Sequence, residues 1–158
     1  KTVKKPLLAK IALMVALAEL AGAAGSLFTA QSVNTWYSIL NKPAFILPDW
    51  TFAPVWIILY ALMGIAAGLV WHSKNKKKQL ALHVYWLQLG LSLLWPIVFF
   101  GLRSPFYAFI GIIVLWLAIL FTMDTFYRVS RRASWMMVPY IVWVSFVAIL
   151  NASIWVMN

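Results

Sequence analysis

Five long apolar runs account for nearly all of this 158-residue chain. They occupy residues 7–28, 51–71, 80–101, 106–127 and 135–157. A run of about 20 residues spans about 30 Å as an α-helix, which is the thickness of the hydrocarbon core of a bilayer. Backbone groups in lipid must bond within their own segment, which helices achieve. The sequence therefore predicts an all-α integral membrane bundle of five transmembrane helices, and a single domain over residues 1–158.

The net charge of +10 is distributed unevenly between the two sides of such a bundle. Eleven of the 13 basic residues lie before or in the first turn of the first run, or in the second and fourth connections, while the other two connections carry only Lys42 and Arg103. The positive-inside rule then predicts a cytoplasmic amino terminus and an outer carboxyl terminus. Anionic lipid headgroups are the natural counterions, so the lipid bilayer is the expected partner and nucleic acid is not.

Several classes of chemistry have little support in the composition. The chain has no cysteine, which excludes thiolate catalysis and thiolate metal sites. His72 and His83 flank the lysine-rich turn without other residues at ligand spacing. No combination of serine, histidine and acid and no glycine-rich phosphate loop is arranged for hydrolysis or nucleotide binding. We therefore expect no metal and no required cofactor.

The first connection, residues 29–50, is long for so short a chain. It contains Trp36, Tyr37, Phe45 and Trp50, and proline recurs at 43 and 48. Aromatic residues at a membrane interface are typical of an anchoring belt. Together with the prolines, however, they favour a folded lid over the mouth of the bundle.

Three runs carry aromatic and small polar side chains at helical spacing. The stripes are Phe52, Trp56, Tyr60 and Met63; then Tyr85, Gln88, Ser92, Trp95 and Phe99; then Tyr140, Trp143, Val147, Asn151 and Trp155. One interpretation is helix packing. The other is a pocket for a large, flat, apolar ligand, whose polar edge Gln88, Ser92 and Asn151 would orient.

The remaining polar and small residues give local predictions. Glu19 lies deep in the first run, so it should be neutral or face a polar interior, either in a functional role or bonded to a neighbouring helix. Beside it, small residues at 18, 22 and 25 allow close approach of a helix of the same bundle or of a second subunit. Pro96 and Pro139 should bend their helices. Asp124 should pair with Arg128.

The motifs of the aromatic stretches resemble one known family. They are WY..L.KP at 36–43, P.W.F.PVW..LY..MG at 48–64, QL at 88–89, W...FFG at 95–101 and PY..W..F...LN at 139–151. This pattern is similar to the TspO/MBR family, which includes the bacterial tryptophan-rich sensory proteins and the mitochondrial translocator protein, or peripheral-type benzodiazepine receptor. The resemblance extends from about residue 36 to the end.

The resemblance implies a five-helix membrane bundle, commonly a homodimer, with a pocket under the first loop for porphyrins such as protoporphyrin IX and haem. The family's loop tyrosine corresponds to Tyr37, and its two pocket tryptophans correspond to Trp56 and Trp143. Ser92 replaces a common asparagine, and Val147 replaces a small residue, which would narrow the pocket. The carboxyl end lacks the tyrosine and basic residue of the animal sterol motif.

From the residues and the resemblance together we expect a receptor, sensor or translocator of porphyrins in a bacterial inner membrane. The expected ligand-binding residues are Tyr37, Pro48, Phe52, Trp56, Tyr60, Gln88, Ser92, Trp95, Phe99, Trp143, Val147 and Asn151. An enzymatic alternative is light-dependent oxidative degradation of protoporphyrin IX, for which Trp56 and Trp143 are the candidate catalytic residues. A third alternative is a proton-coupled exporter that uses Glu19.

Overall fold

The computed structural model describes residues 4–158, which form helices and contain no strand. The α-helices are α1 (Lys4–Val33), α2 (Phe52–His72), α3 (Lys78–Pro96), α4 (Pro105–Tyr127), α5 (Arg131–Met136) and α6 (Val138–Met157). Short α5 and long α6 together form the fifth apolar segment. Within the described residues, five helical segments are thus long and apolar enough to cross a membrane, as predicted. The first helix differs most from its predicted bounds, because the predicted run ends at residue 28 and α1 continues to Val33.

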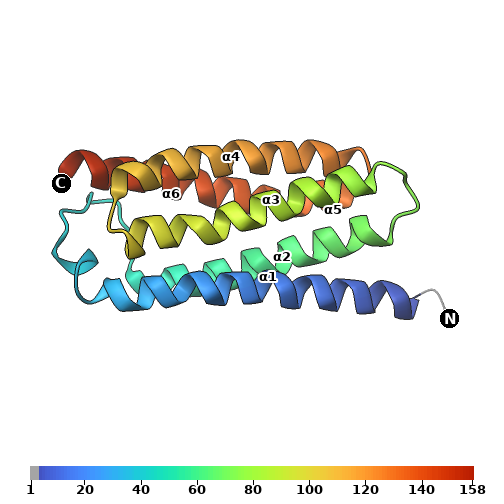
Figure 1. The fold of residues 1–158 in the computed structure, drawn as a ribbon, viewed down its shortest axis with the longest axis horizontal. Coiled ribbons are helices and arrows are strands. Elements are labelled where there is room, and N and C mark those ends of the chain that lie inside the picture. The colour runs from blue at the N-terminus through green and yellow to red at the C-terminus, as the bar shows by residue number, and fades with distance from the viewer. Residues whose placement is uncertain (1–3) are drawn as a thin grey trace.

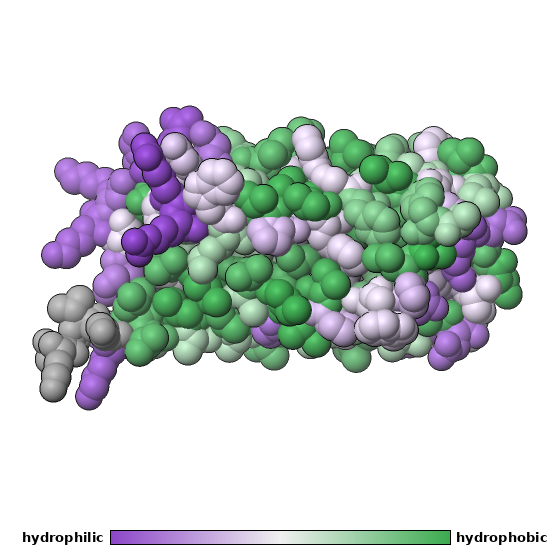
Figure 2. All heavy atoms as spheres, turned by 180° about the vertical axis from the view of Figure 1, so that it is seen from behind, coloured by the Kyte–Doolittle hydropathy of each residue, from purple (hydrophilic) through white to green (hydrophobic). Residues whose placement is uncertain are grey.

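The helices lie side by side in an elongated bundle, and α1 begins at the end opposite to the end of α6 (Figure 1). The two basic turns, between α2 and α3 and between α4 and α5, lie at the end where α1 begins (Figure 1). Figure 2 shows hydrophilic side chains gathered most densely at one end of the bundle, and mainly hydrophobic side chains along its middle. This distribution matches a protein surrounded by lipid along its length.

Close contact between α1 and α2 depends on glycine. A Cβ added at Gly64 would collide with the backbone of Val15, and one added at Gly68 would lie 2.7 Å from Ile11 Cα. Farther along α1, a Cβ at Gly22 would lie 2.7 Å from the Tyr60 ring. Gly22 of α1 and Gly64 and Gly68 of α2 therefore allow close approach of the two helices inside one subunit.

The two predicted proline effects are present. Pro96 is the last residue of α3, and the chain continues as a π-helix, Ile97–Gly101, in which Leu102 N–H donates to the Ile97 carbonyl at 2.9 Å. Such wide turns occur where a proline has removed a donor from the helical ladder. Pro139 lies in the first turn of α6, directly after the break at Met137. The predicted pairing of Asp124 and Arg128 is also confirmed, at 2.8 Å.

The first loop, residues 34–51, folds over the end of the bundle and contains the 3-10 turns Tyr37–Ile39 and Asp49–Thr51. Tyr37 is buried against Phe99 and Phe100, with ring centroids 6.2 and 5.5 Å away. The loop is also held by the end of α6, because Asn41 N–H donates to Asn158 Oδ1 at 2.9 Å and Asn158 Nδ2 donates to the Asn41 carbonyl at 2.9 Å. A folded lid is therefore present, although Trp50 is 74% exposed and lies outside its packing.

Candidate functional site: an aromatic cavity beneath the first loop

A cavity of about 650 Å³ lies under the first loop, between α1, α2, α3 and α6. The close glycine contacts between α1 and α2, including Gly22 against the Tyr60 ring, close the cavity at one end, and the lid lies over the other end. Volumes of about 300–1,000 Å³ are typical of sites that bury drug-sized ligands. The cavity is thus large enough for a ligand of several fused rings.

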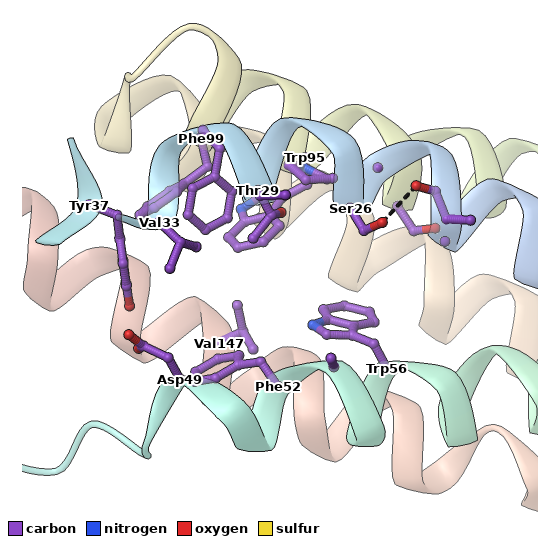
Figure 3. A pocket seen from close by; sticks show the side chains of 18 of the residues that line it. Ser26, Thr29, Val33, Tyr37, Asp49, Phe52, Trp56, Trp95, Phe99 and Val147 are labelled. Carbon is purple, nitrogen blue, oxygen red and sulfur yellow. Dashed lines mark hydrogen bonds between the residues drawn. The ribbon is translucent and has the colours of Figure 1, made fainter. Parts of the chain in front are cut away.

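Aromatic rings form most of two walls. Phe52, Trp56 and Tyr60 lie on successive turns of α2 and line the cavity. Trp95 of α3 and Phe99 of the π-helix face Phe52 and Trp56 across it (Figure 3). The Trp56 and Tyr60 rings lie 5.7 Å apart, and Trp95 stacks on Phe99 at 5.3 Å with an interplanar angle of 26°. Flat rings at helical spacing present a continuous apolar surface, on which a planar ligand can stack.

Helix α1 forms another wall, which the sequence interpretation assigned to helix packing alone. Its contributors are mostly small residues: Gly22, Ala23, Gly25, Ser26, Thr29, Ala30 and Val33. Their short side chains leave the volume that the rings of α2 and α3 enclose. The sequence did contain a signal for this wall, because this face of α1 carries no large residue over three turns. The cavity also includes Asp49 of the first loop, Ala53 and Ile57 of α2, and Pro96, Phe100, Leu150 and Ile154, none of which had been predicted as site residues.

Two of the predicted polar residues are engaged by the protein itself. Asn151 Oδ1 accepts from Trp95 Nε1 at 3.1 Å, and Asn151 Nδ2 donates to the Pro105 carbonyl at 2.8 Å. The amide therefore fixes the Trp95 ring and anchors the start of α4. Ser92 Oγ donates to the Leu89 carbonyl at 2.9 Å and lies 3.2 Å from Tyr60 Oη.

At the mouth, the Tyr37 hydroxyl and the Asp49 carboxylate point toward each other across the cavity (Figure 3). Lys42 Nζ lies 4.4 Å from the centre of the Tyr37 ring, within the range of a cation–π contact. Burial, and secondarily the negative charge of Asp49, raises the pKa of Tyr37 to about 12. The phenol thus stays neutral at physiological pH. At the opposite end, Glu19 places a carboxyl group in the lining.

The sequence signature of the TspO/MBR family matches residues 14–156. The tryptophan-rich protein TspO of Archaeoglobus fulgidus is 41% identical over 137 residues, covering 87% of this chain and 89% of the relative. The translocator protein of Homo sapiens is 34% identical over 134 residues, covering 83% and 79%. The tryptophan-rich sensory protein of Cereibacter sphaeroides is 36% identical over 118 residues, covering 75% and 73%.

The chain belongs to the TspO/MBR family. With its five apolar helices, it is an integral membrane protein. The family match begins within α1, so it is more extensive than the resemblance seen in the aromatic motifs.

Most of the residues predicted for a TspO/MBR ligand site do meet in the cavity. They are Tyr37, Phe52, Trp56, Tyr60, Ser92, Trp95, Phe99, Val147 and Asn151. Pro48, Gln88 and Trp143 are not part of the lining. Pro48 is exposed at the start of the turn Asp49–Thr51, which directs Asp49 into the mouth instead. Gln88 is fully buried, one turn before Ser92, where its Nε2 reaches Met63 Sδ at 3.6 Å.

Trp143 lies behind the cavity wall. Its ring centroid is 5.5 Å from that of Phe52 and 6.5 Å from that of Trp56, and both of these residues face the cavity. The two tryptophans therefore converge as the sequence predicted, but only Trp56 reaches the ligand space. Trp143 supports the rings of Phe52 and Trp56 from behind.

Proposed function

We propose that this protein binds porphyrins, such as protoporphyrin IX and haem, in the aromatic cavity and acts as a membrane sensor or translocator of them. The observation that carries the proposal is the arrangement of Phe52, Trp56, Trp95 and Phe99 around about 650 Å³ of mostly apolar space. Stacking on such rings favours planar aromatic ligands over flexible lipids. The small-residue wall of α1 supplies the width that a flat macrocycle needs.

The direct test is a titration of the detergent-solubilised protein with protoporphyrin IX, followed by quenching of tryptophan fluorescence. We expect saturable quenching with one site per chain. A Trp56→Ala, Trp143→Ala double variant should lose affinity, because it removes both the ring that contacts the ligand and the ring that supports it. Unchanged affinity in this double variant would contradict the proposal.

A second candidate activity is light-dependent oxidation of bound protoporphyrin IX by dioxygen. The edge-to-face contact of Trp56 and Trp143 favours it, because adjacent indoles can share an oxidised state formed next to a photoexcited ligand. Illuminating the complex, with and without dioxygen, distinguishes this activity from binding. A new absorbing product that requires light, dioxygen and Trp56 would support the enzymatic alternative.

A third candidate is proton-coupled export, for which the position of Glu19 in the cavity lining is the supporting observation. Loss of ligand flux in Glu19→Gln, with binding intact, would favour it. We also propose a homodimer with the amino terminus in the cytoplasm of a bacterial inner membrane. Cross-linking in native membranes tests the dimer, and accessibility of single cysteines introduced at Lys76 and Ser104 tests the orientation.

A further inference from the structure

Next to the cavity, a separate group of polar side chains lies inside the helix bundle. Tyr85 and Gln88 of α3 and Tyr140 of α6 are fully buried, and none of them lines the ligand cavity. Tyr85 and Tyr140 belong to the same apolar core as Met63 and Leu89. The group is therefore distinct from the site described above.

Three atoms of this group have no hydrogen-bond partner among residues 4–158: Tyr85 Oη, Gln88 Oε1 and Tyr140 Oη. Gln88 Nε2 reaches only the thioether of Met63, which is a weak acceptor. Bulk water does not reach the core of a bundle surrounded by lipid, so an unbonded polar atom is costly there. Each of these three atoms therefore calls for a hydrogen-bond partner.

The three residues lie in the part of the core next to the Tyr60–Ser92 contact. Tyr85, Gln88 and Ser92 lie at spacings of three and four, which places them on one face of α3. On α6, Tyr140 is buried in the same core as Tyr60 and Tyr85. The ring of Tyr140 also lies 6.2 Å from that of Trp56, which packs on Tyr60 from the cavity side.

The available protons define what the partner must be. Ser92 donates its proton to the Leu89 carbonyl, so Tyr60 is the donor in the 3.2 Å contact with Ser92. The Tyr60–Ser92 pair therefore has no proton left for Gln88 Oε1. The group as a whole offers two phenol donors, from Tyr85 and Tyr140, and one amide acceptor.

We propose that Tyr85, Gln88 and Tyr140 form a buried water site behind the Tyr60–Ser92 end of the ligand cavity. Water accepts two hydrogen bonds and donates two, so one molecule can accept from the two phenols and donate to the Gln88 carbonyl oxygen. A metal cation would need carboxylate or neutral histidine ligands, which this group lacks. The site would support the polar end of the cavity while remaining closed to the ligand.

A crystal structure of the full chain grown in a lipidic phase, at a resolution that shows ordered water, tests the proposal directly. We expect density within hydrogen-bond distance of at least two of the three orphaned atoms. A dry cluster, or a direct bond between two of these side chains that leaves no room for water, would overturn it.

Thermal unfolding of single and double variants gives an independent test. If Tyr140 Oη bonds to water, Tyr140→Phe should lower the Tm; if it is unbonded, removing it should raise the Tm. Tyr85→Phe should behave alike, and the double variant should lose less than the sum, because both hydroxyls share one molecule. A raised Tm in either single variant, or strict additivity, would contradict the proposal.

Tyr107→Phe is the matched control, because Tyr107 is 66% exposed on α4 and its hydroxyl should make no difference. If the double variant fails to fold, the two single variants and the crystal density still decide the question. None of these measurements uses a porphyrin, so the outcome does not depend on the proposed ligand.

Discussion

The indole rings of Trp56 and Trp143 meet edge to face, with centroids 6.5 Å apart and planes at 88°. They come from α2 and α6, and only Trp56 lines the cavity. Trp143 instead packs against Phe52 and Phe146, at 5.5 and 5.4 Å. One indole is therefore placed to contact a ligand, and the other is placed to hold the first in position.

This relationship predicts unequal effects of two single substitutions on porphyrin binding. Trp56→Ala should weaken protoporphyrin IX binding by at least about tenfold, since loss of one stacked ring costs on the order of 1.4 kcal/mol or more. Trp143→Phe should have a smaller effect, because it keeps an aromatic ring behind Phe52. Fluorescence quenching of each variant measures both dissociation constants.

Trp155→Ala is the control for this comparison. Trp155 stacks on Phe109 at 5.8 Å and does not line the cavity. The Trp155→Ala variant should therefore bind protoporphyrin IX with the same affinity as the unmodified protein. Equal losses in all three variants would indicate that the porphyrin partitions nonspecifically onto the apolar surface.

The sequence predicted the helices well because their length is set by the bilayer and their number by the apolar runs. It also predicted the lid, because prolines and aromatics together excluded a simple helical continuation. Periodicity assigned Gln88 and Trp143 to the correct faces of α3 and α6. It could not give their depth: Ser92 and Val147, one turn further along the same faces, line the cavity, while Gln88 and Trp143 do not.

The wall formed by α1 could not be predicted in the same way. A row of glycine, alanine and serine is compatible with close helix packing and with open space, and only the positions of the neighbouring helices decide between them. Here both outcomes occur on one helix. Gly22 contacts the Tyr60 ring, while Ser26 and Thr29 face the cavity.

The contact between α1 and α2 predicts opposite effects of two glycine substitutions on stability. Gly64→Ala places a methyl group against the backbone of Val15, which cannot move aside as a flexible side chain would. It should destabilise the protein by about 1–3 kcal/mol. Gly90→Ala on α3 meets no atom of the described chain within 4 Å and should stabilise its helix by about 0.5–1 kcal/mol.

Thermal unfolding in detergent compares the two variants under one condition. The Tm of Gly64→Ala should fall and that of Gly90→Ala should rise or stay unchanged. A drop of equal size in both would mean that glycine flexibility, and not the approach of α1 to α2, accounts for the effect.

The lid should loosen when its connection to the end of α6 is weakened. Asn158→Ala deletes both side-chain hydrogen bonds to the Asn41 backbone, which contribute about 0.5–1.5 kcal/mol each. We expect faster protoporphyrin IX dissociation and faster proteolysis within residues 34–51, with little change in global Tm. Stopped-flow dissociation and limited proteolysis measure these effects.

Asn75→Ala provides a matched control, because Asn75 Nδ2 makes a comparable bond to the Arg128 carbonyl at the opposite end of the bundle. Removing it should leave ligand dissociation unchanged. If both variants release the ligand at the same faster rate, the effect lies in general stability and the connection between Asn41 and Asn158 does not govern the lid.

The docking of Tyr37 predicts a pH dependence of lid stability. Burial, assisted by the charge of Asp49, raises the pKa of Tyr37 to about 12, above the value of about 10 in an unfolded chain. Between these values the docked form holds more protons than the released form, so its stability is fully present below about pH 10 and declines as the pH rises toward 12. Proteolysis of the first loop should therefore accelerate over this interval.

Tyr37→Phe keeps the ring under Lys42 and removes the ionisable hydroxyl, so proteolysis of this variant should accelerate less over the same interval. An identical pH profile in Tyr37→Phe and the unmodified protein would assign the alkaline effect to other groups and contradict this account of how the lid is held.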